Sequence, residues 1–387
     1  MDPSVVTPLR IAIDYRPALR ARTGVGEYVY QLVRALRQEY PNDLVTLFTS
    51  SWKDRPAPGL SQTLVGASIS DHRIPVRLLN MAWHNLELPR VEWLTRRTFD
   101  VAFSPHPLLL PASSAQVVMV HDLDFLKHPE RTEREIRRDY PRLARPHAHR
   151  AARIVVPSQY TAAQVEALLH VPRSKIAVCP AGFPEWARAP RGFDRTGYLL
   201  FVGSLEPRKN LSQLLTAYEE LVTRLPALPR LVLAGRLSDG MNDLLHRTTR
   251  PPLVGRVDHL GYVSDAERQS VYEGARALVL PSFDEGFGMP ALEAMSLGIP
   301  VVASDRGALP ELVGDAGILI DPTSEADLAE ACRQVLTDDG LAQDLADRGR
   351  SRAATFSWRR TAQTVRQAFA EAVGRRGQPL SGSEHRV

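Results

Sequence analysis

The most distinctive chemistry in the sequence lies in the segment Pro281–Glu293, where two glutamates frame a glycine-containing turn. Glu285 and Glu293 stand at the two ends of the run Glu-Gly-Phe-Gly-Met-Pro-Ala-Leu-Glu. Pro290 suits the first turn of a helix, and a helix N-terminus attracts phosphate through its free amides. The residues expected at this turn are Gly286, Phe287, Gly288 and Met289. Carboxylates accept hydrogen bonds from vicinal hydroxyls, so the segment predicts a site for a sugar and a ribose joined by phosphate. The alternative is that the glutamates only cap the helix and bind no ligand. This is disfavoured because Glu285 precedes the helix by several residues in the sequence.

A second candidate is the run Phe201–Asn210, in which a strand-like segment leads into Gly203 and then into adjacent cations. Arg208 offers a planar fork and Lys209 a point charge, and both suit a leaving diphosphate. Asn210 is a typical N-cap residue for the helix that follows. A basic surface turn without a ligand is the alternative reading.

The third candidate is a glycine loop after the first strand, Arg22-Thr-Gly-Val-Gly-Glu-Tyr28. Gly24 and Gly26 lack the third glycine or alanine of the dinucleotide fingerprint, because Val29 occupies that position. The loop therefore disfavours a nicotinamide cofactor and favours close approach to a diphosphate or an acceptor.

The fourth candidate is His121 with Asp122, at the end of another strand. A histidine there suits hydrogen bonds to substrate hydroxyls or proton exchange. Asp122 and Asp124 have the spacing of a carboxylate pair for a divalent metal, but the cations of the second candidate make a metal redundant, and no metal site is predicted. Tyr262, also in a loop after a strand, is expected near the nucleotide base.

Strand-like apolar runs alternate with helical segments along the chain, which predicts α/β architecture with parallel sheets. The pattern lapses between residues 184 and 197 and then restarts, so two Rossmann-like domains are expected. Because open parallel sheets bind ligands at the carboxyl ends of their strands, the predicted active site lies in a cleft between the two domains. The expected boundaries are 1–185, 197–357, a final helix at 358–374 and a disordered tail at 375–387.

The composition is that of a globular protein, with 44% apolar and 24% charged residues in 387 and a net charge of +4. No apolar run reaches the roughly 18 residues that span a bilayer, and Met1–Arg10 lacks a signal core, which predicts a cytoplasmic location. Two cysteines are too few for a disulfide framework.

An arginine-rich stretch lies between residues 131 and 153. It is either a solvated helix face or a surface that binds the anionic phosphates of a lipid carrier or membrane. Trp83 and Trp93 are further candidates for contact with a membrane interface. No nucleic-acid-binding motif accompanies the arginine-rich stretch.

Taken together, these motifs resemble the retaining glycosyltransferases of the GT-B fold, in the large family with an E-x7-E motif (glycosyltransferase family 4, group 1). Glu285 and Glu293 look like that motif, Gly203–Asn210 like its phosphate loop, and the glycine loop and His121 like its N-terminal elements. The resemblance covers nearly the whole chain, and Phe356-Ser-Trp358 resembles the segment that crosses back to the first domain. Ser204 departs from the family, because many members carry arginine after the glycine of the phosphate loop.

The resemblance implies that Glu285 binds the hydroxyls of the donor sugar and Glu293 the ribose. It further implies that Arg208 and Lys209 hold the diphosphate and that His121 contacts the transferred sugar. The family generally needs no metal, so neither a metal nor another cofactor is expected besides the nucleotide-sugar substrate.

The sequence looks closest to bacterial mannosyltransferases of polysaccharide assembly. The expected reaction moves mannose from GDP-mannose to a glycan or lipid-linked acceptor, with peripheral contact to an anionic membrane. A sugar-nucleotide epimerase, a phosphorylase and a non-catalytic nucleotide-sugar-binding protein are the alternatives; the last is disfavoured because Glu285 and Lys209 are both present.

Overall fold

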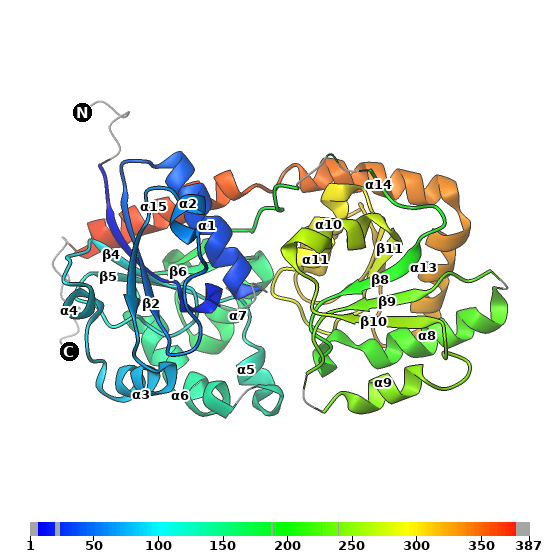
Figure 1. Ribbon diagram of the computed structural model, residues 1–387, viewed down its shortest axis with the longest axis horizontal. Helices are drawn as coiled ribbons and strands as arrows, with labels where there is room; N and C mark the ends of the chain where they lie inside the picture. Colours follow the sequence, from blue (N-terminus) through cyan, green and yellow to red (C-terminus); the bar gives the residue numbers. More distant parts are fainter. Residues whose placement is uncertain are drawn as a thin grey trace, which may run out of the picture. The chain divides into compact units, whose positions relative to one another are not determined.

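The computed structural model describes residues 7–19, 24–132, 134–186, 189, 191–225, 227–238 and 240–376. The chain divides into two compact units, shown in Figure 1, one formed by residues 1–181 with 358–387 and the other by 182–357. Each unit is built on a parallel β-sheet, as the alternation of apolar runs predicts. No helix within the described ranges combines the length and the apolar character that a membrane span requires.

The sheet of the first unit has the strand order β3-β2-β1-β4-β5-β6-β7, and all its described pairs are parallel. Its strands are β1 Arg10–Asp14, β2 Leu44–Ser50, β3 Ser68–His72, β4 Val101–Ser104, β5 Ala115–Met119, β6 Arg153–Val156 and β7 Ile176–Val178. Its helices are η1 Arg16–Ala18, α1 Val25–Glu39, α2 Leu60–Thr63, α3 Val76–Leu86, α4 Val91–Thr95, α5 Asp124–Lys127, η2 Pro129–Arg131, α6 Arg134–Arg150, α7 Gln159–Leu169, η3 Arg173–Lys175 and α15 Trp358–Arg376.

Apolar helix faces cover both sides of this sheet. On one side α15 packs on α1 and on β4 to β7, and Phe369 contacts Phe103 with ring centroids 5.4 Å apart. On the other side α3 buries Leu79 and Trp83 against Ala102 and its neighbours. Figure 1 shows α1 and α15 on one side of the strands and α3 and α6 on the other. Burial on both sides explains why the central strands are almost wholly apolar.

The sheet of the second unit repeats this pattern with the order β10-β9-β8-β11-β12-β13. Its strands are β8 Tyr198–Val202, β9 Leu231–Ala234, β10 Val257–Gly261, β11 Ala275–Leu280, β12 Val301–Ser304 and β13 Ile318–Ile320. Its helices are η4 Pro207–Lys209, α8 Leu211–Arg224, α9 Asn242–Thr248, α10 Asp265–Glu273, α11 Met289–Leu297, α12 Leu309–Val313, α13 Glu325–Thr337 and α14 Asp339–Ala353. Helix α8 packs on α13, and α11 packs on α14.

In both sheets the strand order reverses direction beside the first strand of the unit. The reversal falls between β1 and β4 in the first unit and between β8 and β11 in the second. At such a switch point the two connecting loops run to opposite faces of the sheet and leave a crevice at the carboxyl ends of the strands. Ligand-binding residues are therefore expected on the loops that follow β1, β4, β8 and β11.

Candidate active site

In the second unit, the loops after β8 and β11 bring together three residues that the sequence singles out. The ammonium of Lys209 donates to Glu285 Oε1 at 2.5 Å, and Arg208 Nη1 lies 3.4 Å from Glu285 Oε2. Ser282, which the sequence analysis missed, also donates to Glu285 Oε1 at 2.8 Å. The side chains of Lys209 and Glu285 are only 9% and 8% exposed. The structure thus places a buried charged cluster at the switch point of this sheet.

The electrostatics of this cluster favour an ionised glutamate. Burial alone raises the pKa of Glu285, but the charges of Lys209 and Arg208 more than offset it, so that its pKa lies below the usual value. A carboxylate buried between two cations is hydrogen-bonded and paired, as a buried charge must be. If an anionic ligand drew the two cations away, Glu285 would be left needing new hydrogen-bond donors, such as hydroxyl groups.

Backbone contacts fix the position of Glu285 from a third loop, the one after β12. The amide of Ala308 donates to the carbonyl of Glu285 at 2.8 Å. Gly307 has φ +66°, and a Cβ on it would lie 2.6 Å from the Glu285 nitrogen. Only glycine allows this close approach, so Gly307 holds the Glu285 loop in place.

The turn between the two glutamates has the conformation that the sequence predicts. Gly288 has φ +100° at the N-cap of α11, and Pro290 follows in the first turn. No side chain among the described residues caps this helix end, so the first-turn amides keep their capacity to bind an anion. The ring of Phe287 is buried against Phe356, with centroids 6.0 Å apart, and Gly286 and Met289 complete the turn.

Glu293 lies on α11, where two groups of α10 hold its carboxylate. Tyr272 donates its hydroxyl to Glu293 Oε2 at 2.8 Å, and Arg268 Nη1 lies 3.3 Å from Oε1. Burial and the neighbouring Glu293 charge raise the pKa of Tyr272, which keeps this hydroxyl protonated as a donor. Neither Tyr272 nor Arg268 carries a signal in the sequence, since both precede the motif and belong to another helix.

Two further predicted residues lie on neighbouring loops of the same unit. Gly203 directly follows β8 and has φ +147°. Tyr262 follows β10, and the guanidinium of Arg236 lies 4.8 Å from the centre of its ring. Asn210 occupies the expected N-cap position of α8, but with φ +58° its side chain does not cap the helix, and its amide donates instead to the carbonyl of Pro322 at 2.7 Å. The left-handed conformation, which asparagine tolerates, turns the side chain away from the helix.

In the first unit, the predicted histidine follows β5 and is oriented by the chain around it. The Nε2 atom of His121 lies 3.2 Å from the carbonyl of Pro105, so Nε2 carries the proton and Nδ1 remains an acceptor. The edge of the imidazole packs on Tyr28, with ring centroids 5.3 Å apart. Burial lowers the pKa of His121 to about 4, so the ring is neutral at neutral pH. Asp122 accepts a hydrogen bond from the amide of Asp124, the first residue of α5, at 3.2 Å.

The glycine loop is described only in part, because Arg22 and Thr23 fall outside the described residues. Gly24 is the N-cap of α1 with φ +48°. A Cβ on Gly26 would lie 2.7 Å from the carbonyl of Pro17, so close packing of α1 on η1 requires this glycine.

A buried ion pair that the sequence analysis missed lies at the switch point of the first sheet. Asp14 ends β1 and pairs with Arg16 at 2.6 Å, and His106 Nε2 lies 3.2 Å from the same carboxylate oxygen. Burial opposes ionisation of Asp14, but Arg16 and His106 hold its pKa well below the usual range. These residues could have been found from the sequence, because they stand at or just after the ends of β1 and β4, where ligand-binding residues are expected.

Arginines of the stretch between residues 131 and 153 contribute contacts within the first unit, and the expected interfacial role of Trp83 is wrong. Arg137 donates to three backbone carbonyls and Arg150 pairs with Glu87, so these arginines serve the fold. Trp83 is 3% exposed and belongs to the core, whereas Trp93 is 60% exposed.

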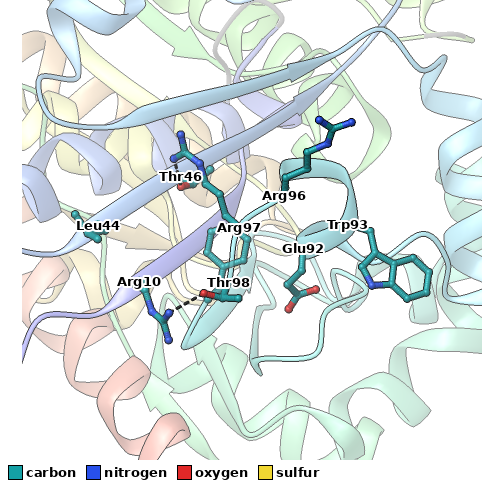
Figure 2. A pocket seen from close by; sticks show the side chains of 9 residues that line it. Arg10, Leu44, Thr46, Glu92, Trp93, Arg96, Arg97 and Thr98 are labelled. Carbon is teal, nitrogen blue, oxygen red and sulfur yellow. Dashed lines mark hydrogen bonds between the residues drawn. The ribbon is translucent and has the colours of Figure 1, made fainter.

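A separate pocket of about 700 Å³ lies in the first unit at the amino ends of β1 and β2 (Figure 2). Its lining residues are Arg10, Leu44, Thr46, Glu92, Trp93, Arg96, Arg97, Thr98 and Phe99. Arg10 donates to Thr98 at 2.7 Å, and Arg97 donates to Thr46 at 3.1 Å (Figure 2). None of the predicted site residues lines this pocket. It lies at the amino ends of the strands, whereas Asp14 lies at the carboxyl end of β1.

Comparisons with known proteins agree with this geometry. The sequence profile described as "Glycosyl transferases group 1" matches residues 183–352, and the profile described as "Glycosyltransferase Family 4" matches residues 22–185. The chain is a GT-B glycosyltransferase. It is 29% identical over 378 residues to the O-antigen chain mannosyltransferase B of Escherichia coli, which covers 92% of this chain and 98% of that protein.

Solved structures show the same GT-B fold. A sucrose-phosphate synthase from Thermosynechococcus elongatus superposes with a TM-score of 0.76 at 20% identity, covering 95% of this chain and 99% of that one. The Anabaena protein HepE, solved with UDP and glucose, superposes with a TM-score of 0.68 at 18% identity over 94% of this chain and 99% of that one. These structures confirm the fold with two Rossmann-like units, and the family profiles together with the sequence relative confirm the predicted glycosyltransferase.

Proposed function

We propose that the chain is a retaining mannosyltransferase that moves mannose from GDP-mannose to a glycan acceptor in polysaccharide synthesis. The observation that carries this proposal is the buried cluster of Lys209, Arg208 and Glu285 at the switch point of the second sheet. The match to an O-antigen mannosyltransferase over 92% of the chain supports the choice of mannose and of a glycan acceptor.

In this proposal the cluster exchanges its partners when the donor binds. The diphosphate attracts Lys209 and Arg208 and meets the uncapped end of α11. Glu285 then accepts hydrogen bonds from hydroxyls of the donor sugar, while Glu293 holds the ribose. The cations and the helix end stabilise the negative charge that develops on the leaving diphosphate, which is electrostatic preorganisation of the transition state. With two cations present, the proposal needs no metal ion.

Retention of configuration follows from front-face attack, in which the acceptor hydroxyl passes its proton to the departing phosphate. The neutral His121 would act as a hydrogen-bond partner of the transferred sugar, because its Nδ1 atom remains an acceptor. We assign the protein to the cytoplasmic side of the membrane.

Peripheral contact with an anionic membrane is part of the proposal for a lipid-linked acceptor. Arg142 and Arg145 are exposed on α6, and Trp93 is exposed on α4. Binding of the protein to vesicles of phosphatidylglycerol tests this part, and it fails if Arg142→Ala with Arg145→Ala leaves the bound fraction unchanged.

The reaction is tested by incubating the protein with GDP-mannose and a synthetic α-mannobiose, followed by NMR of the anomeric protons of the product. The proposal predicts a new α-mannoside and loss of product with Lys209→Ala. A β-mannoside would overturn retention. Transfer from UDP-glucose but not from GDP-mannose would overturn the assigned donor.

A further inference from the structure

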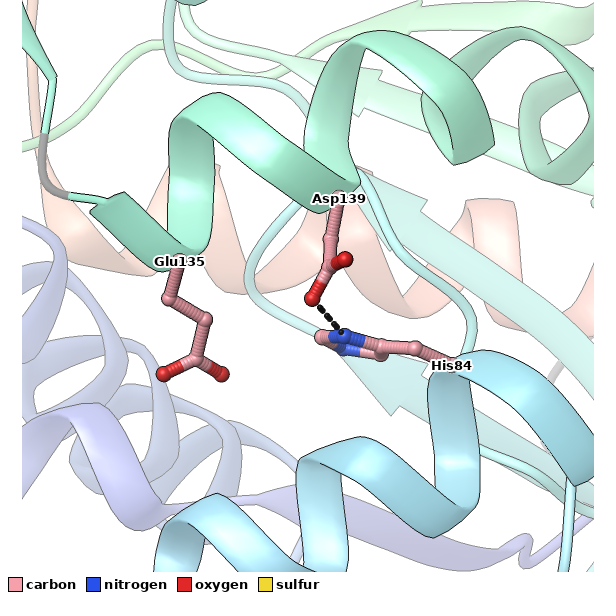
Figure 3. A group of neighbouring side chains, drawn as sticks. All are labelled: His84, Glu135 and Asp139. Carbon is pink, nitrogen blue, oxygen red and sulfur yellow. Dashed lines mark hydrogen bonds and ion pairs between the residues drawn. The ribbon is translucent and has the colours of Figure 1, made fainter.

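A polar cluster in the first unit, whose residues the sequence analysis did not name, joins helices α3 and α6 (Figure 3). His84 extends from α3, and Glu135 and Asp139 extend from α6. One ligand-capable atom of each side chain lies within 4.8 Å of the other two. His84 Nδ1 lies 2.7 Å from Asp139 Oδ2, the contact drawn in Figure 3.

Hydrogen bonds connect this cluster to the carboxyl edge of the sheet. The amide of Asn80 donates to Glu135 Oε1 at 2.6 Å, and Arg16 Nη1 donates to Asn80 Oδ1 at 2.7 Å. Arg16 in turn pairs with Asp14 at the end of β1. The cluster therefore belongs to the edge at which an open parallel sheet binds its ligands, next to the switch point between β1 and β4.

Two atoms of the cluster remain available to a ligand. A carboxylate only accepts, so Nδ1 of His84 donates to Asp139 and Nε2 is left as an acceptor. Burial lowers the pKa of His84 despite the neighbouring Asp139, so the imidazole is neutral at neutral pH. Within the described residues, neither His84 Nε2 nor Glu135 Oε2 has a hydrogen-bond partner.

The charges disfavour a metal ion and an anion at this position. Both oxygens of Asp139 already accept from Arg138, at 2.8 and 2.7 Å, so a metal would have to displace the guanidinium. Glu135 has no ion pair with a described cation, and Arg138 acts on it only at longer range, so a negative charge lies next to the ligand. A phosphate or carboxylate would be repelled by it, whereas hydroxyl donors would match the two open acceptors.

We propose that His84 and Glu135 bind two hydroxyl groups of an uncharged sugar, the terminal residue of the acceptor, while Asp139 positions the imidazole. This subsite rests on the proposed function, because it supplies the acceptor for the glycosyl transfer. It restricts the acceptor to a neutral sugar at this position and excludes one that carries phosphate on the bound hydroxyls.

Saturation-transfer difference NMR tests the subsite without any transfer reaction. The probes are methyl α-D-mannopyranoside and mannose 6-phosphate, offered at equal concentration to the wild-type protein. We expect a signal from the neutral sugar, a much weaker one from the phosphorylated sugar, and loss of the neutral-sugar signal in Glu135→Gln and His84→Gln. Glu166→Gln is the matched control, since Glu166 is an exposed carboxylate on α7 of the same unit. The melting temperature of each variant confirms that it is folded.

A kinetic measurement complements the binding assay. With mannobiose as acceptor and GDP-mannose as donor, Glu135→Gln should raise the acceptor KM about 10-fold or more, as expected for loss of a charge-assisted hydrogen bond. The kcat and the donor KM should stay within about 2-fold, since the subsite is remote in the chain from Lys209 and Glu285.

The possible outcomes separate the two proposals. If the sugar binds the wild-type protein but no mannose is transferred, the subsite stands and the assigned function fails. If transfer occurs with an unchanged acceptor KM in both variants, the subsite fails and the function stands. Equal signals from both sugars, no signal from the wild-type protein, or calorimetric binding of Zn²⁺ that the same variants abolish would each overturn the subsite.

Discussion

Lys209 and Glu285 meet at 2.5 Å although they belong to different loops, one after β8 and the other after β11. Both side chains are almost fully buried, and no other carboxylate within the described residues pairs with Lys209. The contact joins the two strands that flank the switch point of the second sheet. In the proposed mechanism this pair stabilises the free protein, and its two residues bind the donor once the ligand separates them.

Replacing Lys209 by methionine should separate these two roles. The substitution leaves Glu285 buried with only Arg208 as a charged partner, so we expect a loss of about 1–3 kcal/mol in the free energy of unfolding. Transfer activity should fall by about 100-fold or more, because the developing charge on the diphosphate loses a cation. Urea unfolding and initial rates measure the two effects.

The double variant Lys209→Met with Glu285→Gln provides the control. It removes both charges, so it should recover part of the lost stability while remaining inactive. Additive loss of stability in the double variant would show that the two residues are not energetically coupled.

Gly307→Ala should disturb Glu285 through the backbone. Its Cβ would approach the nitrogen and the oxygen of Glu285 to 2.6 and 2.7 Å, and its φ of +66° adds conformational strain. We expect a loss of about 1–3 kcal/mol in stability, together with lower activity, measured by thermal unfolding and rate assays. Gly314→Ala is the control, because Gly314 has φ +57° but open space around its Cβ. Equal losses in activity for both variants would contradict the assigned role of Gly307.

Tyr272→Phe should show whether Glu293 needs its partner on α10. The substitution removes the 2.8 Å hydrogen bond to Glu293, with an expected cost of about 1 kcal/mol in stability and a higher donor KM. Tyr198→Phe removes a comparable 2.7 Å bond to the carbonyl of Val271 in the same unit. Tyr198→Phe should lose similar stability but keep its donor KM. An unchanged donor KM in Tyr272→Phe would show that the hydrogen bond from Tyr272 to Glu293 does not contribute to donor binding.

The lowered pKa of His121 predicts a dependence of stability on pH. The imidazole binds its proton near pH 6.5 in the unfolded chain and near pH 4 in the folded protein. Between these values the unfolded state binds more protons, so stability falls as the pH falls from about 6.5 towards 4. Compared with the wild type, His121→Gln should lose roughly 2 kcal/mol less between pH 7 and pH 5, as urea unfolding at both values can measure. Parallel pH profiles of the two proteins would contradict the buried, neutral state of this ring.

The sequence predicted the parts of the fold whose apolar runs are continuous. Tyr198–Val202 and Ala275–Leu280 are buried on both faces, so their β-branched and aliphatic residues mark them as strands. The edge strand Ser68–His72 was missed because it is polar and only partly buried. Helix α3 was missed as well, since it lies in a long connection without a preceding strand signal.

The predicted site was more complete in the second unit than in the first. Arg208, Lys209 and Glu285 lie within short motifs that follow strands, and the structure brings them together. His84 and Asp139 are 55 residues apart in the chain, and no local pattern links them. Their pairing depends on how α3 and α6 pack on the sheet, which the sequence of either helix alone does not determine.

We propose that the second unit binds a GDP-linked sugar without a metal ion. The most direct test is to measure the melting temperature of the protein, with and without EDTA, in the presence of GDP-mannose, UDP-glucose, UDP-GlcNAc or ADP-glucose. A ligand that binds only the folded state raises the melting temperature by mass action. The account predicts a rise with GDP-mannose that EDTA does not change and that Lys209→Met abolishes. A rise with a UDP-sugar alone, or one that EDTA removes, would contradict it.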